Sequence, residues 1–281
     1  MKKKPNARRS GSVIKKSDVF STDRQLPFEC VFADMSERLL KLQRDLIMPA
    51  VIFEKNKIQN TITFFGASRI KPADAAKAEL EKIKKNPGAK GYREKLRHAK
   101  NVLAMSKYYA AAETLAKRLQ EWVNISNVPE EDKFHIMTGG GPGIMEAVNR
   151  GTFMAGGTTV GATISIGSEI RNEYVEKGVW FNFNYFLMRK FWLLFFAKAI
   201  VVFPGGVGTL DELFEVLTLI KTRKTHKKIP MVLFGKSFWQ KAINFKALLA
   251  ADVISQSDVD LIKYADTVED AYNYIISIIK K

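Results

Sequence analysis

The chain has 281 residues, of which 46% are hydrophobic and 26% charged, and its formal net charge is +16. This composition is ordinary for a globular protein, and a membrane span is not expected, because the longest apolar stretch, residues 179–203, is interrupted by Arg189, Lys190 and Lys198. The basic start is followed by no apolar segment, so we expect no signal peptide. The single cysteine, Cys30, excludes an internal disulfide, and the three scattered histidines argue against a metal site. A reducing, cytoplasmic setting is therefore expected.

The positive charge raises the question of nucleic acid as a partner. Residues 1–16 hold seven Lys or Arg residues and no acidic residue, which leaves +9 for the rest of the chain. We expect this remainder to be spread over helices that also contain Asp and Glu. Clustered cations bind phosphate backbones, but a solvated surface or the attraction of small anionic substrates is the favoured interpretation. Neither nucleic acid nor a membrane is therefore expected as a partner.

The first part of the chain is predicted to lie outside the main domain. Residues 1–30 are polar and basic, and we expect a flexible basic arm. Residues 31–59 are predicted as a helical extension. Its helix is expected to begin near Asp34 and to bend or end near Pro49, because proline lacks the N–H that the helix interior needs.

Residues 60–281 alternate between short apolar strands and helices, so we interpret them as one domain. The first strand is predicted at residues 61–66. Residues 71–100, rich in Lys, Glu and Ala, are predicted as a helical surface excursion with a turn at residues 86–88. The elements that follow are predicted as helix 105–123, strand 134–138, helix 143–155, strand 158–165, a helix from about 187, strand 199–203, helix 209–221, strand 229–234, helix 237–250 and helix 267–280.

This alternation predicts an α/β fold. Parallel strands need long crossover connections, so strands that alternate with helices predict a three-layer arrangement, a parallel sheet with helices on both faces. Ligands of such sheets bind at the carboxyl ends of the strands. Three glycine-containing segments follow predicted strands, at residues 66–68, 139–143 and 205–208. We therefore expect a ligand site where these segments meet.

The densest of them, residues 204–209 with the sequence PGGVGT, joins a predicted strand to a predicted helix. Glycines allow positive φ and close backbone approach, and the first helical turn presents unpaired N–H groups, so a phosphate is the natural occupant. The Walker A pattern, GxxxxGK[ST], is absent, because neither glycine cluster is followed by its lysine. The dinucleotide pattern GxGxxG is absent as well, because Ile144 and Asp211 stand where its third glycine would be. A single phosphate is therefore predicted, with a purely structural turn as the alternative.

Charged residues next to these turns supply candidate chemistry. Residues 209–212 fit the S/T-x-x-E capping box, so Glu212 is either a helix cap or a catalytic carboxylate. Arg189 and Lys190 stand at the start of an apolar helix, where a buried cation needs a partner. One of the two is expected to meet an anion, and the other, by a weak preference Lys190, to reach solvent.

Taken together, these residues resemble the Lonely Guy (LOG) family, cytokinin riboside 5′-monophosphate phosphoribohydrolases often labelled as lysine decarboxylases. Residues 204–212, PGGVGTLDE, look like its PGGxGTxxE signature, and the resemblance covers about residues 60–245. It implies a Rossmann-like fold, a homodimer or a multiple of it, and hydrolysis of a nucleoside 5′-monophosphate to free base and ribose 5-phosphate. We expect the reaction to need no metal and no cofactor. The other matching segments are residues 65–69, 139–146, 188–190 and 232–235, followed by Trp239.

By matching position, the resemblance implies that Arg189 and Glu212 form the catalytic pair. A fixed carboxylate suits the oxocarbenium-like charge that develops when a ribosyl–base bond breaks, and arginine can fork onto a phosphate or hold the carboxylate ionised. Val207 and Asp211 stand where Tyr and Glu are common, so adenine and a cytokinin base both stay open as the product. The substrate-binding residues implied are Ser68, Gly139, Gly140, Gly141, Gly143, Glu169, Met188, Lys190, Gly205, Gly206, Val207, Gly208, Thr209 and Thr218.

Two other classes of function are kept as alternatives. A non-catalytic nucleotide-binding or carrier protein would use the same glycine turns without hydrolysis, and a nucleic-acid-binding protein would use the basic arm. The lysine decarboxylase label finds no support, because no group of residues identifies a lysine that would hold pyridoxal phosphate.

Overall fold

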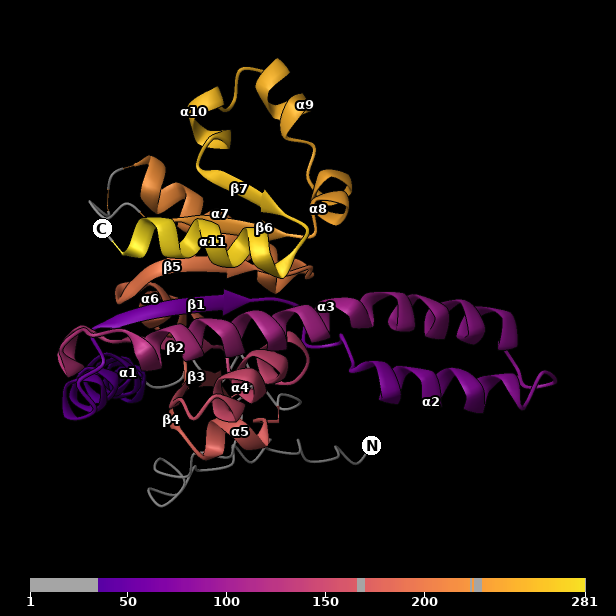
Figure 1. Ribbon diagram of the computed structural model, residues 1–281, viewed down its shortest axis with the longest axis horizontal. Helices are drawn as coiled ribbons and strands as arrows, with labels where there is room; N and C mark the ends of the chain where they lie inside the picture. The colour runs from indigo at the N-terminus through magenta and orange to yellow at the C-terminus, as the bar shows by residue number, and fades with distance from the viewer. Residues whose placement is uncertain (1–34, 166–169, 223, 225–228, 281) are drawn as a thin grey trace, which may run out of the picture.

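The computed structural model describes residues 35–165, 170–222, 224 and 229–280. Within these residues, one sheet of parallel strands runs in the order β4-β3-β2-β1-β5-β6-β7, with helices on both faces (Figure 1). The predicted α/β, Rossmann-like architecture is confirmed. The expected arm, residues 1–30, lies outside the described residues.

The bounds of the elements follow the predicted alternation closely. The strands are β1 Asn60–Phe65, β2 Phe134–Thr138, β3 Thr159–Ile164, β4 Val179–Phe183, β5 Ala197–Val202, β6 Met231–Phe234 and β7 Ile262–Ala265. The α-helices are α1 Met35–Lys55, α2 Ala73–Lys84, α3 Tyr92–Ile125, α4 Ile144–Met154, α5 Glu173–Glu176, α6 Phe186–Phe195, α7 Val207–Lys221, α8 Lys236–Ala242, α9 Phe245–Ala250, α10 Gln256–Val259 and α11 Val268–Ile279, and η3 Glu130–Asp132 is a 3₁₀ turn.

Some elements differ from the prediction. The two edge strands, β4 and β7, were not expected. The helix predicted at 237–250 is two helices, because the chain leaves the helical conformation at Ile243 and Asn244, and the Asn244 side chain caps α9. Helix α1 continues through Pro49 to Lys55, so the proline does not end it.

The strand order reverses between β1 and β5. Ile62 of β1 lies between Ile136 of β2 and Ala199 of β5. The crossovers leave the sheet in opposite directions on the two sides of this point, which opens a crevice at the carboxyl ends of the strands. Backbone hydrogen bonds connect the turns there: Ala67 N donates to Pro204 O at 3.1 Å, and Ile144 N donates to Ala67 O at 3.1 Å. The three glycine-containing turns therefore meet, as expected.

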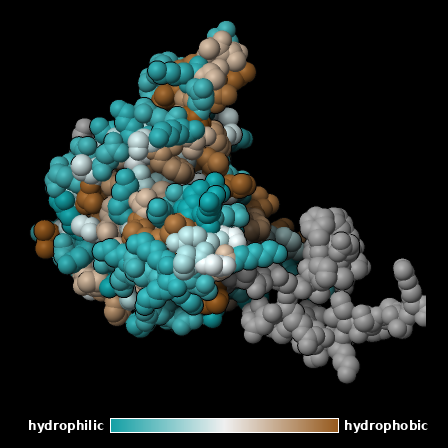
Figure 2. All heavy atoms as spheres, turned by 90° about the vertical axis from the view of Figure 1, so that its right-hand side faces the viewer, coloured by the Kyte–Doolittle hydropathy of each residue, from teal (hydrophilic) through white to brown (hydrophobic). Residues whose placement is uncertain are grey.

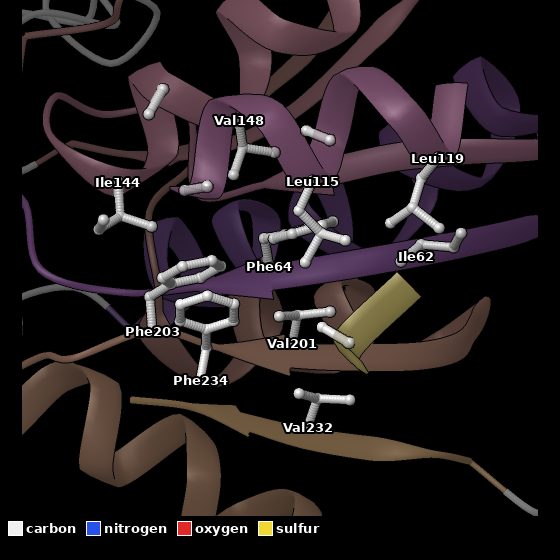
Figure 3. Close-up of a cluster of buried hydrophobic side chains, with 14 of the residues drawn as sticks. Ile62, Phe64, Leu115, Leu119, Ile144, Val148, Val201, Phe203, Val232 and Phe234 are labelled. Atoms are coloured by element: carbon white, nitrogen blue, oxygen red, sulfur yellow. The ribbon is translucent and has the colours of Figure 1, made fainter. Parts of the chain in front are cut away.

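One face of the sheet packs against α3, α4 and α11. Figure 3 shows side chains of β1, β5 and β6 facing those of α3 and α4, with Phe64, Phe203 and Phe234 close together. The Phe203 and Phe234 rings stack with their centroids 4.5 Å apart. Because both faces of the central strands are covered, these strands are apolar throughout rather than alternating.

The other face packs against α1, α6, α7 and α8. Phe53 of α1 is buried, and its ring lies 5.4 Å from the Trp192 ring of α6 and 4.7 Å from the Phe181 ring of β4. The helical extension predicted before the first strand is therefore part of this helical layer and not a separate appendage.

A helical hairpin projects beyond the sheet. The predicted excursion consists of α2 and the first part of α3, which lie side by side and extend away from the strands (Figure 1). Helix α3 has 34 residues, so the helix predicted at 105–123 is its second part and not a separate element. None of the described helices is both long and apolar enough to cross a lipid bilayer.

Candidate active site

A cavity of about 610 Å³ opens at the carboxyl ends of the central strands. Its size is within the usual range for small-molecule sites, and it lies at the reversal of strand order, where ligands of this architecture bind. Its walls come from the end of β1, from the turns after β1, β2 and β5, and from α4, α6 and α7. The lining residues are Phe64, Phe65, Gly66, Ala67, Ser68, Arg69, Gly139, Met145, Phe186, Arg189, Gly206, Val207, Gly208, Thr209 and Glu212.

The turn after β5 brings the amino terminus of α7 to this cavity. The helix begins at Val207, and no side chain caps it. Positive φ was expected in this turn, but Gly205, Gly206 and Gly208, all described, have none. Gly205 is required for a different reason, since a Cβ there would overlap the side chain of Thr209, whereas a Cβ at Gly206 or Gly208 would meet open space. The free N–H groups of the first turn are thus accessible from the cavity side.

Glu212 is not a capping residue. Gly206 is the N-cap with extended backbone (φ −100°, ψ −150°), so the chain becomes helical at Val207. A capping box at residues 209–212 would need Thr209 as the N-cap. Thr209 is then the third helical residue and Glu212 the sixth, in the second turn, and the capping-box interpretation is wrong. Glu212 lines the cavity together with Arg189, so two helices bring a carboxylate and a guanidinium to one site.

Arg189 is buried, and its position depends on its neighbours. Its Nε donates to the carbonyl of Ala162 in β3 at 2.8 Å. A Cβ on Gly139 would overlap Nη2 of Arg189 and would lie 2.8 Å from Sδ of Met145. Glycine at position 139 therefore leaves the space that the guanidinium fills. Because Nε uses only one of five N–H donors, the terminal nitrogens keep donors for a bound anion.

Asp45 of α1 fixes the start of the helix that carries Arg189. Its buried carboxylate accepts hydrogen bonds from Asn184 N and Asn184 Nδ2, both at 2.8 Å, and from Tyr185 N at 3.0 Å. Its backbone carbonyl accepts from Trp192 Nε1 at 3.0 Å. Burial raises the pKa of Asp45, although the hydrogen bonds act in the opposite direction. Asp45 was not predicted as a site residue, because its only signal in the sequence is a single acid among the apolar positions of the first helix.

Lys190 joins α6 to α7. Its ammonium group lies 3.1 Å from Asp211 Oδ1 and 3.2 Å from Glu215 Oε2. Burial opposes the charged form, but the hydrogen bonds to these carboxylates outweigh it and raise the pKa of Lys190. Lys190 is therefore ion-paired and does not simply reach solvent, as had been expected. The signal for this pairing in the sequence was the spacing of Asp211 and Glu215, which stand four residues apart on one face of α7.

The glycine turn after β2 shapes the wall behind Arg189. Gly140 and Gly143 have φ of +74° and +73°, which side-chain-bearing residues rarely adopt. Asn172 Nδ2 donates to Gly140 O at 3.0 Å and to Gly141 O at 2.8 Å, which holds the turn in place. A Cβ on Gly143 would overlap the carbonyl of Ala67, so this glycine allows α4 to approach the turn after β1.

The cavity thus collects part of the predicted site. It is lined by Ser68, Gly139, Arg189, Gly206, Val207, Gly208, Thr209 and Glu212, but not by Gly140, Gly141, Gly143, Met188, Lys190, Gly205 or Thr218. Glu169 lies outside the described residues. The cavity is also lined by residues that were not predicted for the site, most of them within or beside a matching segment and Phe186 two residues before residues 188–190. They are Phe64, Phe65, Gly66, Ala67, Arg69, Met145 and Phe186.

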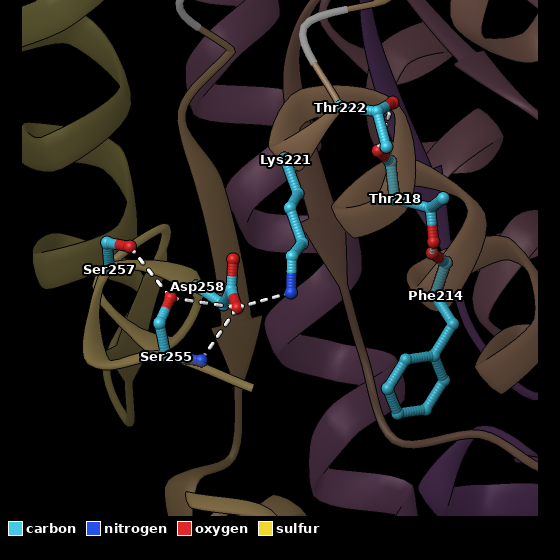
Figure 4. A network of polar contacts seen from close by, with 7 residues as sticks. All are labelled: Phe214, Thr218, Lys221, Thr222, Ser255, Ser257 and Asp258. Atoms are coloured by element: carbon cyan, nitrogen blue, oxygen red, sulfur yellow. Dashed lines mark hydrogen bonds and ion pairs between the residues drawn. The ribbon is translucent and has the colours of Figure 1, made fainter. Parts of the chain in front are cut away.

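Thr218 lies on the outer side of α7. Its hydroxyl donates to the carbonyl of Phe214 at 2.7 Å, within its own helix (Figure 4). It contributes to a shallow groove along α7 that also includes Val207 and Leu210. Further along the same helix, Lys221 reaches Asp258 of the α10 capping box at 2.7 Å. Within one copy of the chain, Thr218 is therefore not part of the cavity.

Comparisons with solved structures gave the following similarities. TM1055, a structural-genomics target, is 21% identical, with a TM-score of 0.48, over 78% of this chain and 99% of that one. The molybdenum cofactor carrier protein from Chlamydomonas reinhardtii is 20% identical, with a TM-score of 0.47, over 79% and 99%. The molybdenum cofactor binding protein from Rippkaea orientalis is 19% identical, with a TM-score of 0.42, over 60% and 88%.

A search of curated proteins gave no match. Among protein families, residues 145–275 match the family described as "Possible lysine decarboxylase". This region includes Arg189 and the complete turn from β5 into α7. The resemblance of residues 145–275 to the LOG-like family with the lysine decarboxylase label is therefore confirmed.

Proposed function

We propose that this chain is a phosphoribohydrolase, which hydrolyses the N-glycosidic bond of a nucleoside 5′-monophosphate such as AMP or a cytokinin riboside 5′-monophosphate. The observation that carries the proposal is the composition of one cavity. It combines the open amino terminus of α7, the guanidinium of Arg189 and the carboxylate of Glu212. An anion site and a carboxylate within one cavity are what this reaction requires.

In this proposal the phosphate of the substrate binds at the first turn of α7. The N–H groups of Gly206, Val207, Gly208 and Thr209 are the natural donors, and the positive end of the helix dipole adds to the attraction. The turn is accessible, because a Cβ on Gly206 or Gly208 would meet no atom within 4 Å. Arg189 adds a buried cation that balances the charge of the phosphate.

The carboxylate of Glu212 serves the chemical step. As the bond between C1′ and the base nitrogen breaks, its electron pair leaves with the base and positive charge develops on the ribosyl ring. Glu212 stabilises this charge and accepts a proton from the attacking water, whose oxygen forms the new bond to C1′. Glu212 then releases this proton to solvent and the departing base takes one up from solvent, so the products are the free base and ribose 5-phosphate.

Apolar residues of the cavity suit the base. Phe65, Met145 and Phe186 line the same space as Glu212, and aromatic and thioether groups pack favourably against a flat heteroaromatic ring. These residues offer no hydrogen-bonding side chain that would select one purine from another. AMP and a cytokinin nucleotide are therefore both proposed as substrates.

The test compares two site variants with a matched control. We expect Glu212→Gln and Arg189→Ala each to lower base release from AMP by at least about a hundredfold, which is the usual effect of removing a transition-state contact. Glu121→Gln, the same chemical change on the exposed surface of α3, leaves it unchanged. Turnover of either site variant at the wild-type rate contradicts the proposal. Tight AMP binding by the wild type without base release would instead assign a nucleotide carrier.

We also propose that the chain forms a homodimer through α6 and α7. Large apolar side chains are exposed on both helices, and monomers rarely leave such a surface uncovered. Phe186 and Val207 belong to it and also line the cavity, so a second copy on this face would close the mouth of the site. The exposed residues are Phe186, Leu187, Phe191 and Phe195 of α6 and Val207 and Phe214 of α7.

Light scattering after size-exclusion chromatography tests the dimer. We expect the wild type at twice the chain mass of 31.8 kDa. Leu187→Glu places a charge on α6 and is expected to yield monomers. Val253→Glu is the matched control, since Val253 and Leu187 are similarly exposed, at 62% and 64%, and it is expected to stay dimeric. A monomeric wild type contradicts the proposed dimer.

A further inference from the structure

The positive charge of the chain is concentrated in two segments. Residues 1–16 carry +7, and residues 82–100 hold eight Lys or Arg residues and one acid, Glu94, which is a further +7. The rest of the chain therefore has a net charge of only +2. The charge beyond the arm was expected to be spread over helices that also contain Asp and Glu, but +7 of its net +9 lies within residues 82–100. Residues 82–100 are also fully described by the structure.

These residues form the tip of the projecting hairpin. They include the end of α2, the connecting turn and the first turns of α3 (Figure 1). The two helices pack through small and apolar residues, of which Ala76, Leu80 and Ala99 are buried. The cationic side chains consequently point away from the helix contact, and all eight are exposed. They are Lys82, Lys84, Lys85, Lys90, Arg93, Lys95, Arg97 and Lys100.

Three of these cations form a stripe on α3. Arg93, Arg97 and Lys100 are spaced by four and three residues, so they lie on one face of the helix. With a rise of 1.5 Å per residue, the stripe is about 10 Å long. Within residues 82–100, the structure pairs only Lys84 with a carboxylate, that of Glu81 at 2.7 Å. The stripe is therefore an uncompensated row of cations, unlike Lys190, which has two carboxylate partners.

The surface around the tip suits a polyanion as its ligand better than a lipid bilayer. Figure 2 faces the side toward which the hairpin projects, and hydrophilic side chains dominate it. No large apolar side chain is exposed between Val51 and Ile125, a stretch that the structure describes completely. Helices that bind membrane surfaces insert large apolar side chains beside their cations. The tip offers only charge, which suits a hydrophilic, evenly charged phosphate chain.

We propose that the tip of the α2–α3 hairpin binds a nucleic acid through its phosphate backbone. Arg93, Arg97 and Lys100 contact successive phosphates, and the cations of the connecting turn extend the contact. No side chain of the tip is arranged to recognise a particular base, so binding is independent of sequence. The proposal concerns a surface outside the cavity, and it stands whether or not the chain hydrolyses nucleotides.

The test measures fluorescence anisotropy of a labelled RNA oligonucleotide and a labelled DNA duplex with the full chain, between about 50 and 200 mM NaCl. The stripe variant carries Arg93→Gln, Arg97→Gln and Lys100→Gln. The control variant carries Lys236→Gln, Lys241→Gln and Lys246→Gln, which removes the same charge from exposed positions of α8 and α9. Both are checked for an unchanged melting temperature.

We expect the wild type to bind at least one probe. The stripe variant is expected to bind at least about tenfold more weakly and to lose about three from the slope of log affinity against log salt concentration. The control variant changes affinity less than about twofold. Equal losses in the two variants, or no binding by the wild type, overturn the proposal.

Two further measurements test whether another segment of the chain or another ligand accounts for the binding. If deletion of residues 1–16 abolishes binding while the stripe variant binds like the wild type, the arm is the binding segment and the proposal is wrong. The proposal is equally wrong if the wild type prefers vesicles of anionic phospholipid to both probes at the same salt concentration and the stripe variant loses that preference.

Discussion

Replacing Gly139 with alanine places a methyl group in the space occupied by the Arg189 guanidinium. The new Cβ overlaps Nη2 of Arg189 and lies 2.8 Å from Met145 Sδ, whereas ordinary contacts begin at 3.4 Å. The guanidinium must shift by about an ångström to relieve this overlap, and the 2.8 Å bond from its Nε to Ala162 O cannot survive such a shift. A misplacement of that size typically costs about a hundredfold in rate. A lost hydrogen bond of a buried charged group costs about 1.5–3 kcal/mol of stability.

The prediction is checked by two measurements on Gly139→Ala. Chromatography of free adenine gives kcat on AMP, expected to fall by about a hundredfold, and urea unfolding gives the loss of stability. Gly88→Ala in the hairpin turn is the matched control, because a Cβ at position 88 meets no atom within 4 Å, and it is expected to behave like the wild type. If Gly139→Ala retains kcat within about threefold, the contact with Arg189 does not position the catalytic site.

Two further predictions concern residues away from the cavity. Asp45→Ala leaves three donors at Asn184 and Tyr185 without their acceptor, so the free energy of unfolding is expected to fall by about 3 kcal/mol in urea titrations and kcat to fall with it; an unchanged kcat argues against a positioning role. Burial lowers the pKa of His135, so its neutral form is favoured in the folded chain, and stability is lost as the pH falls below the unfolded value. Between about pH 7 and 5, His135→Gln is expected to lose less stability than the wild type, and parallel curves contradict this.

The alternation of strands and helices could be predicted because the central strands are buried on both faces. Their apolar runs, such as that of β5, stand out from the amphipathic helices around them. The edge strands carry a weaker signal. β4 runs almost directly into the apolar helix α6, and β7 has only four residues, of which Lys263 is exposed. Their strand conformation depends on pairing with β3 and β6, which a local pattern does not contain.

The candidate site was predictable where it depends on a local motif. The turn from β5 into α7 could be found because glycine, threonine and glutamate follow one another at fixed spacing. The helix start was predicted two residues too late, because residues 209–212 match a capping box although Gly206 is the N-cap. The contact of Gly139 with Arg189 and the bonds of Asp45 to Asn184 join residues far apart in sequence. Only the folded chain brings these pairs together.

The proposed activity is tested most directly by incubating the wild-type protein with AMP and, separately, with adenosine, and by measuring adenine and ribose 5-phosphate by chromatography. The phosphate is expected to bind at the first turn of α7, so AMP is expected to yield equal amounts of the two products and adenosine to yield almost none. Equal release of adenine from both compounds would contradict the role of the α7 turn. No adenine from AMP or from isopentenyladenosine monophosphate would contradict the proposed hydrolysis itself.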